Sequence, residues 1–344
     1  MKLSTFKTIA IASTAIFAAG MFATSVSAKN VTWNLSVWGK PRAFTKGIEK
    51  LTEEVAAKSG GSLKIKIHYG EALSKSKENL DGIKLGAFQM AVFCAAYHPG
   101  KNPTLNALDL PFLPFGNLDV QQAVHEAFYA HPAVKKDMAR WNAGILMTSL
   151  LPQYEFMGVG EPPKSLADWK GKRVRALGGL GKAMTKIGAV PTTVPAPETY
   201  QLLERGAVDA VSWPFSYAHA AYKINEISKW FTGNMSPGTV TCPLVYNTKA
   251  FAKLDAEQQK VLVDARIPAY ATLKAAYKAA DDKNLPAFRK TMMEIKYDDA
   301  TLDAFRKAGA KPVWDDWIKD ATAAGVPAQE LLDLILSEAK KASM

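Results

Sequence analysis

Apolar and polar residues follow two different periods along the chain. Segments that alternate, or that are continuously apolar, indicate β-strands, and segments with an apolar residue every three to four positions indicate amphipathic helices. In the first part of the chain these patterns predict strands over 31–38, 63–69 and 89–93, with helices over 44–58 and 76–85. Strands that alternate with helices are typical of an α/β fold, in which crossover helices connect parallel strands.

A second α/β unit begins near Gly144. Its predicted elements are strands over 145–149, 171–177, 190–194 and 208–212 and helices over 180–187 and 198–205. A further strand is predicted over 240–246, followed by a helical region over 255–293 that Pro268 and Pro286 should kink or interrupt. Two similar units connected by a returning strand and a long helix predict two lobes around a cleft, with the ligand at the carboxyl ends of strands.

The same patterns predict how the chain divides into domains. Domain I takes residues 29–151 plus 241–283, and domain II takes residues 152–240 plus 284–324. The C-terminal helix over 325–344 could cap the monomer or pair with a partner chain. We expect a monomer.

The first 28 residues have the features of a signal peptide. Lys2 and Lys7 precede an apolar stretch over 8–26, and the sequence Val-Ser-Ala that ends at Ala28 fits the small-residue rule for signal peptidase. We therefore expect cleavage after Ala28 and a periplasmic mature chain. The alternative is a transmembrane anchor, for which the stretch is short and interrupted by small polar residues.

The chain is basic, with a formal net charge of +11. Lysines and arginines are interspersed with acidic residues along the predicted helices, and no basic run or nucleic-acid motif occurs. We therefore expect no nucleic-acid partner. The positive net charge should then only mildly attract anionic ligands.

Two cysteines, Cys94 and Cys242, lie far apart in the sequence, each within an apolar stretch. An oxidising compartment would permit a disulfide, but a protein of this size does not need one, and buried free thiols are common. We therefore expect two free cysteines, with a disulfide as the alternative.

Several ordered motifs resemble those of one known family. They are LADWKGKRVR over 166–175, GAVP over 188–191 and ETYQLLERGAVDAVSWP over 198–214, with support from 82–91 and 110–113. In this order they are similar to the DctP-type extracytoplasmic solute receptors of TRAP transporters (tripartite ATP-independent periplasmic transporters). The resemblance extends over essentially the whole chain after Ala28.

The resemblance implies an α/β, two-lobed periplasmic-binding-protein-like fold with a ligand cleft between domains and a long connecting helix. It also implies a receptor that captures a small organic acid and delivers it to the membrane subunits of a TRAP-type symporter. By its position in the family's strand motif, Arg175 would pair with the ligand carboxylate, which a guanidinium matches in a bidentate geometry. The alternative is a buried arginine paired with an internal Asp or Glu. For Arg173 on the same strand we expect a structural role.

Residues at strand ends would form the rest of the pocket. Relatives usually have a polar residue before the proline at position 214, whereas this chain has Trp213, which favours an aromatic wall over ordinary core packing. Where many relatives have a second arginine, this chain has Gln153 and Tyr154, with Glu155 beside them, so a second carboxylate clamp is not expected. The other candidates, each of which could instead pack in the core, are Trp38, Phe93, Cys94, Tyr97, Phe215 and Tyr217.

One arginine among several aromatic residues predicts a monocarboxylate ligand with an apolar or aromatic body. A C4-dicarboxylate and a 2-oxo acid are the alternatives within this class. A receptor for another transporter type or for a sensor kinase also fits the pattern.

Sequence motifs of catalysis are absent. The glycine-rich stretch 178–182 lacks the spacing and the Ser or Thr of a phosphate-binding loop, and no G-x-G-x-x-G or G-x-S-x-G motif occurs. The five histidines do not have metal-ligand spacing. We therefore expect no cofactor, no metal and no enzymatic activity, with a secreted α/β enzyme as the alternative from another class.

Overall fold

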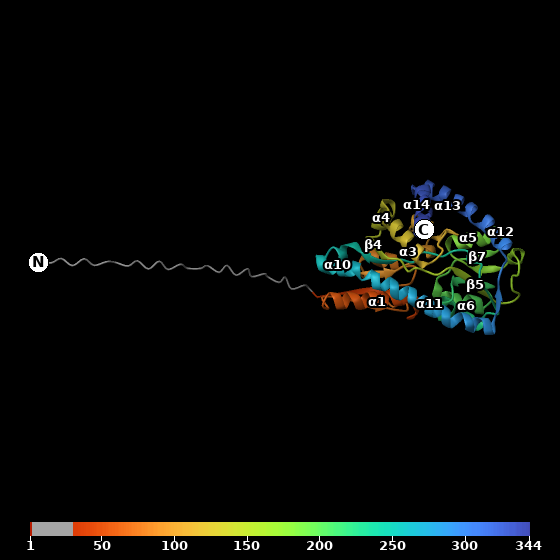
Figure 1. Ribbon diagram of the computed structural model, residues 1–344, viewed down its shortest axis with the longest axis horizontal. Helices are drawn as coiled ribbons and strands as arrows, with labels where there is room; N and C mark the ends of the chain where they lie inside the picture. Colours follow the sequence, from red (N-terminus) through yellow and green to blue (C-terminus); the bar gives the residue numbers. More distant parts are fainter. Residues whose placement is uncertain (2–29) are drawn as a thin grey trace.

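The computed structural model describes Met1 and residues 30–344, which form two α/β lobes side by side (Figure 1). The predicted signal peptide, except for Met1, and its cleavage site therefore lie outside the described residues. No helix in the described part is long and apolar enough to cross a membrane.

The first lobe contains a five-stranded sheet in the order β2-β1-β3-β10-β4. Its strands are β1 (Val31–Ser36), β2 (Leu63–His68), β3 (Met90–Val92), β4 (Ala143–Met147) and β10 (Leu244–Asn247). Strand β1 runs parallel to β2 and β3, as the alternation of strands and helices predicts. Strand β10 returns from the far end of the chain and pairs antiparallel with both β3 and β4.

The second lobe contains a six-stranded sheet in the order β11-β9-β5-β8-β6-β7. Its strands are β5 (Tyr154–Gly158), β6 (Arg173–Arg175), β7 (Val190–Thr192), β8 (Ala210–Pro214), β9 (Trp230–Thr232) and β11 (Met293–Ile295). Strand β6 is parallel to β7 and β8, whereas β5 is antiparallel to β8 and β9. Each sheet thus takes strands from two separated stretches of the chain. The exact domain boundaries stay a prediction.

Helices cover both sheets. Those of the first lobe are α1 (Ala43–Lys58), α2 (Asn79–Leu85), α3 (Leu118–Ala130), α4 (Pro132–Ala139), α9 (Thr248–Phe251), α10 (Ala256–Asp264) and α14 (Ala328–Ala342). Those of the second are α5 (Gly178–Lys186), α6 (Thr199–Glu204), α7 (Tyr217–Ala221), α8 (Ile224–Ile227) and α12 (Asp299–Gly309). Helix α13 (Lys311–Ala323) leads back to α14 and buries Val313, Trp317 and Ala321 in the core of the first lobe. Short 3-10 turns are η1 (Ala95–Tyr97), η2 (Leu105–Asp109), η3 (Leu166–Trp169) and η4 (Ala196–Glu198).

One long helix, α11 (Arg266–Thr291), connects the lobes and packs against α1 of the first and α7 of the second (Figure 1). The predicted helical region divides at Ala265, which places Pro268 in the first turn of α11, where its missing N–H is tolerated. Pro286, by contrast, lies inside α11 without ending it.

The C-terminal helix α14 packs on α3 of the same chain (Figure 1). Its apolar face buries Leu331, Leu332 and Ile335 in the core of the first lobe. Burial of each such side chain stabilises the fold by roughly 1.5–3 kcal/mol. The tail therefore covers its own lobe.

Candidate functional site

A small cavity, here called the interlobe pocket, lies between the lobes and has a volume of about 30 Å³. Its walls come from the segments that follow β1 and β3 in the first lobe and from β5, β6, β8 and α7 in the second. The lining residues are Trp38, Arg42, Phe44, Cys94, Tyr97, Leu151, Tyr154, Arg175, Ala196, Trp213, Pro214, Tyr217, Ala218, Tyr222 and Cys242. Seven residues predicted from the sequence meet here, namely Trp38, Cys94, Tyr97, Tyr154, Arg175, Trp213 and Tyr217.

Arg175 is the most buried charge of the pocket, with 1% of its surface exposed. Its guanidinium donates to backbone carbonyls, from Nε and Nη2 to Val194 O at 3.2 and 2.9 Å and from Nη1 to Ser212 O at 2.9 Å, and it also interacts with the Tyr97 hydroxyl. A guanidinium has five N–H groups. Two of them, one on each Nη, are therefore not used by these carbonyls.

Within residues 30–344, Arg175 forms no ion pair with an Asp or Glu, so the alternative of an internal acidic partner is not found. Arg173, two residues earlier, is exposed and pairs with Asp209 through Nη2 and Oδ1 at 2.5 Å. This ion pair agrees with the structural role expected for Arg173. A buried cation without a protein anion is costly and is stabilised when a ligand anion pairs with it.

Aromatic rings surround Arg175. The Arg175 guanidinium lies 5.5 Å from the ring centroid of Trp213, and Tyr222 meets the same ring edge-on at 4.4 Å. The Trp213 Nε1 and Tyr222 Oη atoms are buried and have no hydrogen-bond partner among the described residues. Two donors are thus available next to the guanidinium.

The tyrosine hydroxyls of the pocket are neutral donors. Burial raises the pKa of Tyr97 and of Tyr154, and it raises the pKa of Tyr222 to about 12. Tyr97 Oη accepts a hydrogen bond from the backbone N–H of Ala196 at 3.1 Å. Its own proton remains free to be donated.

Arg42 is a pocket residue that the sequence analysis did not identify. It is half-buried at the start of α1, donates from Nη1 to Trp38 O at 3.0 Å and Lys40 O at 2.9 Å, and lies over the rings of Phe44 and Tyr222 at 4.6 and 5.5 Å. Its position just after the carboxyl end of β1 could have identified it from the sequence, because ligand sites lie at the carboxyl ends of strands. The pocket therefore has two cations, and no Asp or Glu lines it.

The structure places Phe93, Gln153 and Phe215 outside the interlobe pocket. Phe93 precedes Cys94, so alternation along the strand directs its side chain to the other face, where the ring stacks on His98 at 5.7 Å. Gln153 Nε2 donates to Phe115 O at 3.2 Å beside a different cavity next to α11.

Phe215 follows β8 and packs its ring against Phe231 at 5.8 Å. Glu155 on β5 also faces away from the pocket. Its carboxylate accepts hydrogen bonds from Thr232 Oγ1 at 2.5 Å and from the backbone N–H and hydroxyl of Ser236 at 2.9 and 2.8 Å. Burial raises the pKa of Glu155 to about 7.

The prediction of two free cysteines was wrong, because Cys94 and Cys242 form a disulfide in the pocket wall. The antiparallel pairing of β3 with β10 places Leu244 opposite Val92. Continuing that register by two residues brings Cys94 opposite Cys242, with 4.0 Å between the Cα atoms. The apolar surroundings of each cysteine gave no sign of this long-range pairing.

The described residues contain no cluster of three or more His, Cys, Asp or Glu side chains placed to hold a metal ion. The polar groups of the interlobe pocket are guanidinium, phenol and indole donors. Such a set can bind and orient an anion.

Two lobes around a cationic, aromatic pocket define a class of proteins that close on small anionic solutes. The chain belongs to family 7 of the bacterial extracellular solute-binding proteins (DctP), whose profile matches residues 36–320. Members of this family bind small organic acids and work with TRAP-transporter membrane components.

Individual relatives differ in their ligands. The monocarboxylate 2-oxoacid-binding periplasmic protein of Nostoc sp. (strain PCC 7120) is 26% identical over 262 residues, which cover 74% of this chain and 71% of the relative. DctP7, an extracytoplasmic solute receptor of Bordetella pertussis that binds pyroglutamic acid, has a TM-score of 0.75 at 23% identity, over 89% of this chain and 99% of that one. A TRAP solute-binding protein from a marine metagenome, specific for aromatic acid ligands and solved with 3-hydroxybenzoate, has a TM-score of 0.78 at 23% identity, over 92% of this chain and 100% of that one. The fold alone therefore does not determine the ligand.

Proposed function

We propose that this protein captures a monocarboxylate with an apolar or aromatic body in the periplasm and delivers it to the membrane subunits of a TRAP-type symporter. The observation that carries the proposal is Arg175, a buried guanidinium with unused N–H groups, no acidic partner and an aromatic surround. A carboxylate would accept in a bidentate geometry from the two N–H groups that the carbonyls do not use. The rings of Trp38, Phe44 and Trp213 would contact the ligand body.

The two buried donors next to Arg175 add detail to the ligand. Trp213 Nε1 and Tyr222 Oη each lack an acceptor, and an unsatisfied buried donor costs about 1–3 kcal/mol. A ligand with an oxygen close to its carboxylate would satisfy one or both. This arrangement favours a hydroxy- or oxo-substituted monocarboxylate over an unsubstituted fatty acid.

Arg42 supports a second candidate, a dicarboxylate. Its half-buried guanidinium lines the opposite wall from Arg175, on the first lobe, and could pair with a second carboxylate. Its Nη1 already donates to two carbonyls, and its plane covers the rings of Phe44 and Tyr222. Because of these commitments we rank the dicarboxylate second.

Ligand entry would require the lobes to separate. A volume of about 30 Å³ holds little more than one water molecule, and an organic acid is several times larger. Two crossing segments, 148–153 and 233–243, and helix α11 join the lobes and could act as the hinge. We infer that the structure represents a closed form and that the solute leaves chemically unchanged, without catalysis.

The same proposal covers the protein's location and assembly. The features of residues 1–28 favour export and cleavage after Ala28. Because α14 covers its own lobe, we propose that the receptor acts as a monomer.

A thermal-shift screen of residues 29–344 tests the ligand class. The library would pair each acid with its carboxamide, across aromatic, branched, 2-oxo, dicarboxylic and sugar acids. A ligand at ~100 times its dissociation constant adds about 2.7 kcal/mol to the free energy of unfolding. We expect stabilisation by aromatic or apolar monocarboxylates and none by the amides. If only dicarboxylates stabilise the protein, the second candidate replaces the first, and equal effects of acids and amides would refute carboxylate recognition.

A further inference from the structure

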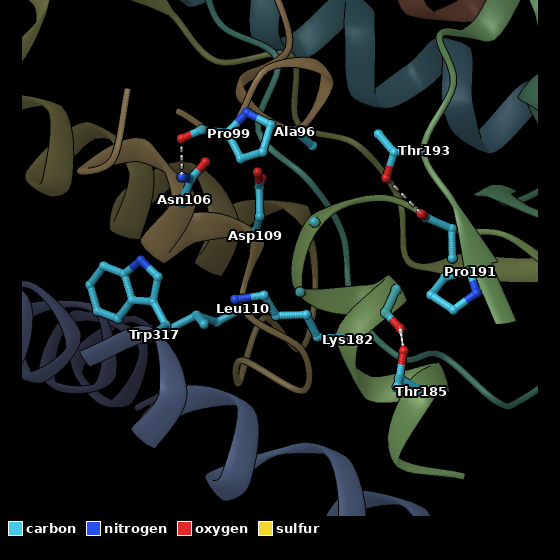
Figure 2. Close-up of a pocket in the computed structure, with 14 residues that line it drawn as sticks. Ala96, Pro99, Asn106, Asp109, Leu110, Lys182, Thr185, Pro191, Thr193 and Trp317 are labelled. Carbon is cyan, nitrogen blue, oxygen red and sulfur yellow. Dashed lines mark hydrogen bonds between the residues drawn. The ribbon is translucent and has the colours of Figure 1, made fainter. Parts of the chain in front are cut away.

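A second, larger cavity lies between the lobes, on the other side of strand β6 from the interlobe pocket. Arg175 lines the first cavity, and the next residue, Ala176, lines the second. We call this second space the α5 cavity, and its volume is about 280 Å³. Figure 2 shows it between Asn106 and Asp109 of the first lobe and Lys182 of the second.

The N-terminus of helix α5 forms one wall of the α5 cavity. This helix spans nine residues, starts with Gly178 and Gly179, and has neither a side-chain cap nor an acidic residue in its first turn. The first N–H groups of a helix have no partner within it, and the helix dipole favours an anion there. The two glycines allow this backbone to lie close to the opposite wall, because a Cβ atom at Gly178 would lie 3.5 Å from Asp109 Oδ2 and one at Gly179 would lie 2.3 Å from Asp109 O.

The opposite wall carries an independent sign of a missing ligand group. Asp109 is 2% exposed, its Oδ1 accepts from the backbone N–H of Thr241 at 2.6 Å, and its Oδ2 has no partner among the described residues. Burial raises the pKa of Asp109 well above its ordinary value. A neutral carboxyl group in this position offers an O–H donor to the cavity, as an ionised one would not.

Lys182 supplies the charge. It is exposed, has no hydrogen bond or ion pair within the described residues, and extends from α5 across the cavity toward Leu110 and Trp317 (Figure 2). Lys186, one helical turn further on, pairs with Asp316. Lys182 has no such acid.

We propose that the α5 cavity is a second binding site, which takes a small oxyanion such as phosphate or a carboxylate between the α5 N-terminus, Lys182 and the Asp109 carboxyl group. An anion held there contacts both lobes, so it favours the closed form. This site is separate from the one that carries the proposed function.

Isothermal titration calorimetry with inorganic phosphate and with acetate, each against sodium chloride at equal ionic strength, tests the proposal. Arg175→Ala serves as the background, because it removes the anchor of the interlobe pocket. We expect saturable binding to this variant, weakened at least fivefold when Lys182→Ala is added. Lys307→Ala, which removes an exposed lysine of α12 away from the cavity, is the matched control and should change nothing.

Asp109 provides a second comparison. Asp109→Asn keeps a donor of similar shape and should retain binding, whereas Asp109→Leu should lose it. As a guard against misfolding of the Arg175→Ala protein, phosphate is also titrated into wild-type protein that is saturated with the acid found in the screen. Because both ligands favour the closed form, this protein should bind phosphate at least as tightly as the Arg175→Ala background. Competition between phosphate and acetate identifies the preferred anion. Absence of phosphate and acetate binding, or binding that Lys182→Ala and Lys307→Ala affect equally, would overturn the proposal and leave the interlobe pocket unaffected.

Discussion

Replacing Arg175 by alanine should abolish most of the protein's affinity for its acid. The guanidinium uses three N–H groups on Val194 O and Ser212 O, and the other two, next to the Tyr97 hydroxyl, are not used by these carbonyls. The carbonyls lose their donor in the free and in the bound protein alike, so that loss affects folding stability and cancels in the binding free energy. What remains is the carboxylate itself, which would enter a buried site without its counter-ion.

Removing one partner of such a desolvated charge pair costs about 2–5 kcal/mol of binding free energy. At 1.36 kcal/mol per factor of ten, that range corresponds to a dissociation constant that is roughly 30- to 5,000-fold larger. Arg175→Lys should recover only part of the loss, because an ammonium lacks the planar fork and cannot reach both backbone carbonyls and the carboxylate.

Calorimetric titration of the best acid from the screen measures the effect. The matched control is Arg173→Ala on the same strand, which breaks an exposed ion pair with Asp209 and should leave the dissociation constant within about twofold. Circular dichroism must show that each variant is folded. Folded Arg175→Ala protein that binds as tightly as the wild type would refute the reasoning.

Three other predictions concern the pocket wall and the core. Arg42→Ala should weaken binding of a monocarboxylate by about 1 kcal/mol, which is roughly fivefold in the dissociation constant, because Arg42 is half-exposed. The same calorimetric titration measures this effect, and a loss as large as that of Arg175→Ala would favour a dicarboxylate ligand. Because the pKa of Glu155 is about 7 in the folded protein and 4.5 ordinarily, the folded state retains a proton that the unfolded chain releases between these values. Its stabilising contribution is therefore full below about pH 4.5 and is lost as the pH rises through 7, at up to about 1.4 kcal/mol per pH unit. Glu155→Gln should remove this decline from urea-unfolding curves taken at several pH values, and an unchanged slope would contradict the assigned pKa. Replacing Cys94 and Cys242 by serine should lower the free energy of unfolding by roughly 2–5 kcal/mol, because the disulfide closes a long loop; identical unfolding curves for wild-type protein with and without reductant would contradict its presence.

The periods of apolar residues were enough to predict the two α/β units, because strands and crossover helices are local patterns. Phe44, Ile48, Leu51 and Val55 form the buried face of α1 that their spacing predicts. Arg175 ends a strand and lies in the interlobe pocket, as its local motif indicates, and its pairing with a ligand carboxylate stays a prediction.

Residues that depend on long-range geometry escaped the sequence analysis. The pairing of Cys94 with Cys242 follows from the register of β3 and β10, which lie far apart in the sequence. Arg42 reaches the pocket because the loop before it turns back at Gly39, whose φ is +70° and where a Cβ atom would lie 2.5 Å from Tyr222 Oη. Such an approach between lobes leaves no local pattern in either segment.

The assignment of Phe93 and Cys94 shows a limit of a different kind. Both residues follow β3, and one of them had to face the pocket while the other faced the core. The sequence did not indicate which face was which, because both surroundings are apolar. Only the position of the second lobe decides it.

A crystal structure with the best acid from the screen would test the central claim most directly. We expect the ligand between the lobes, with its carboxylate oxygens about 2.7–2.9 Å from the Nη atoms of Arg175 and its body against Trp213. A ligand bound elsewhere, or one whose carboxylate points away from Arg175, would contradict it.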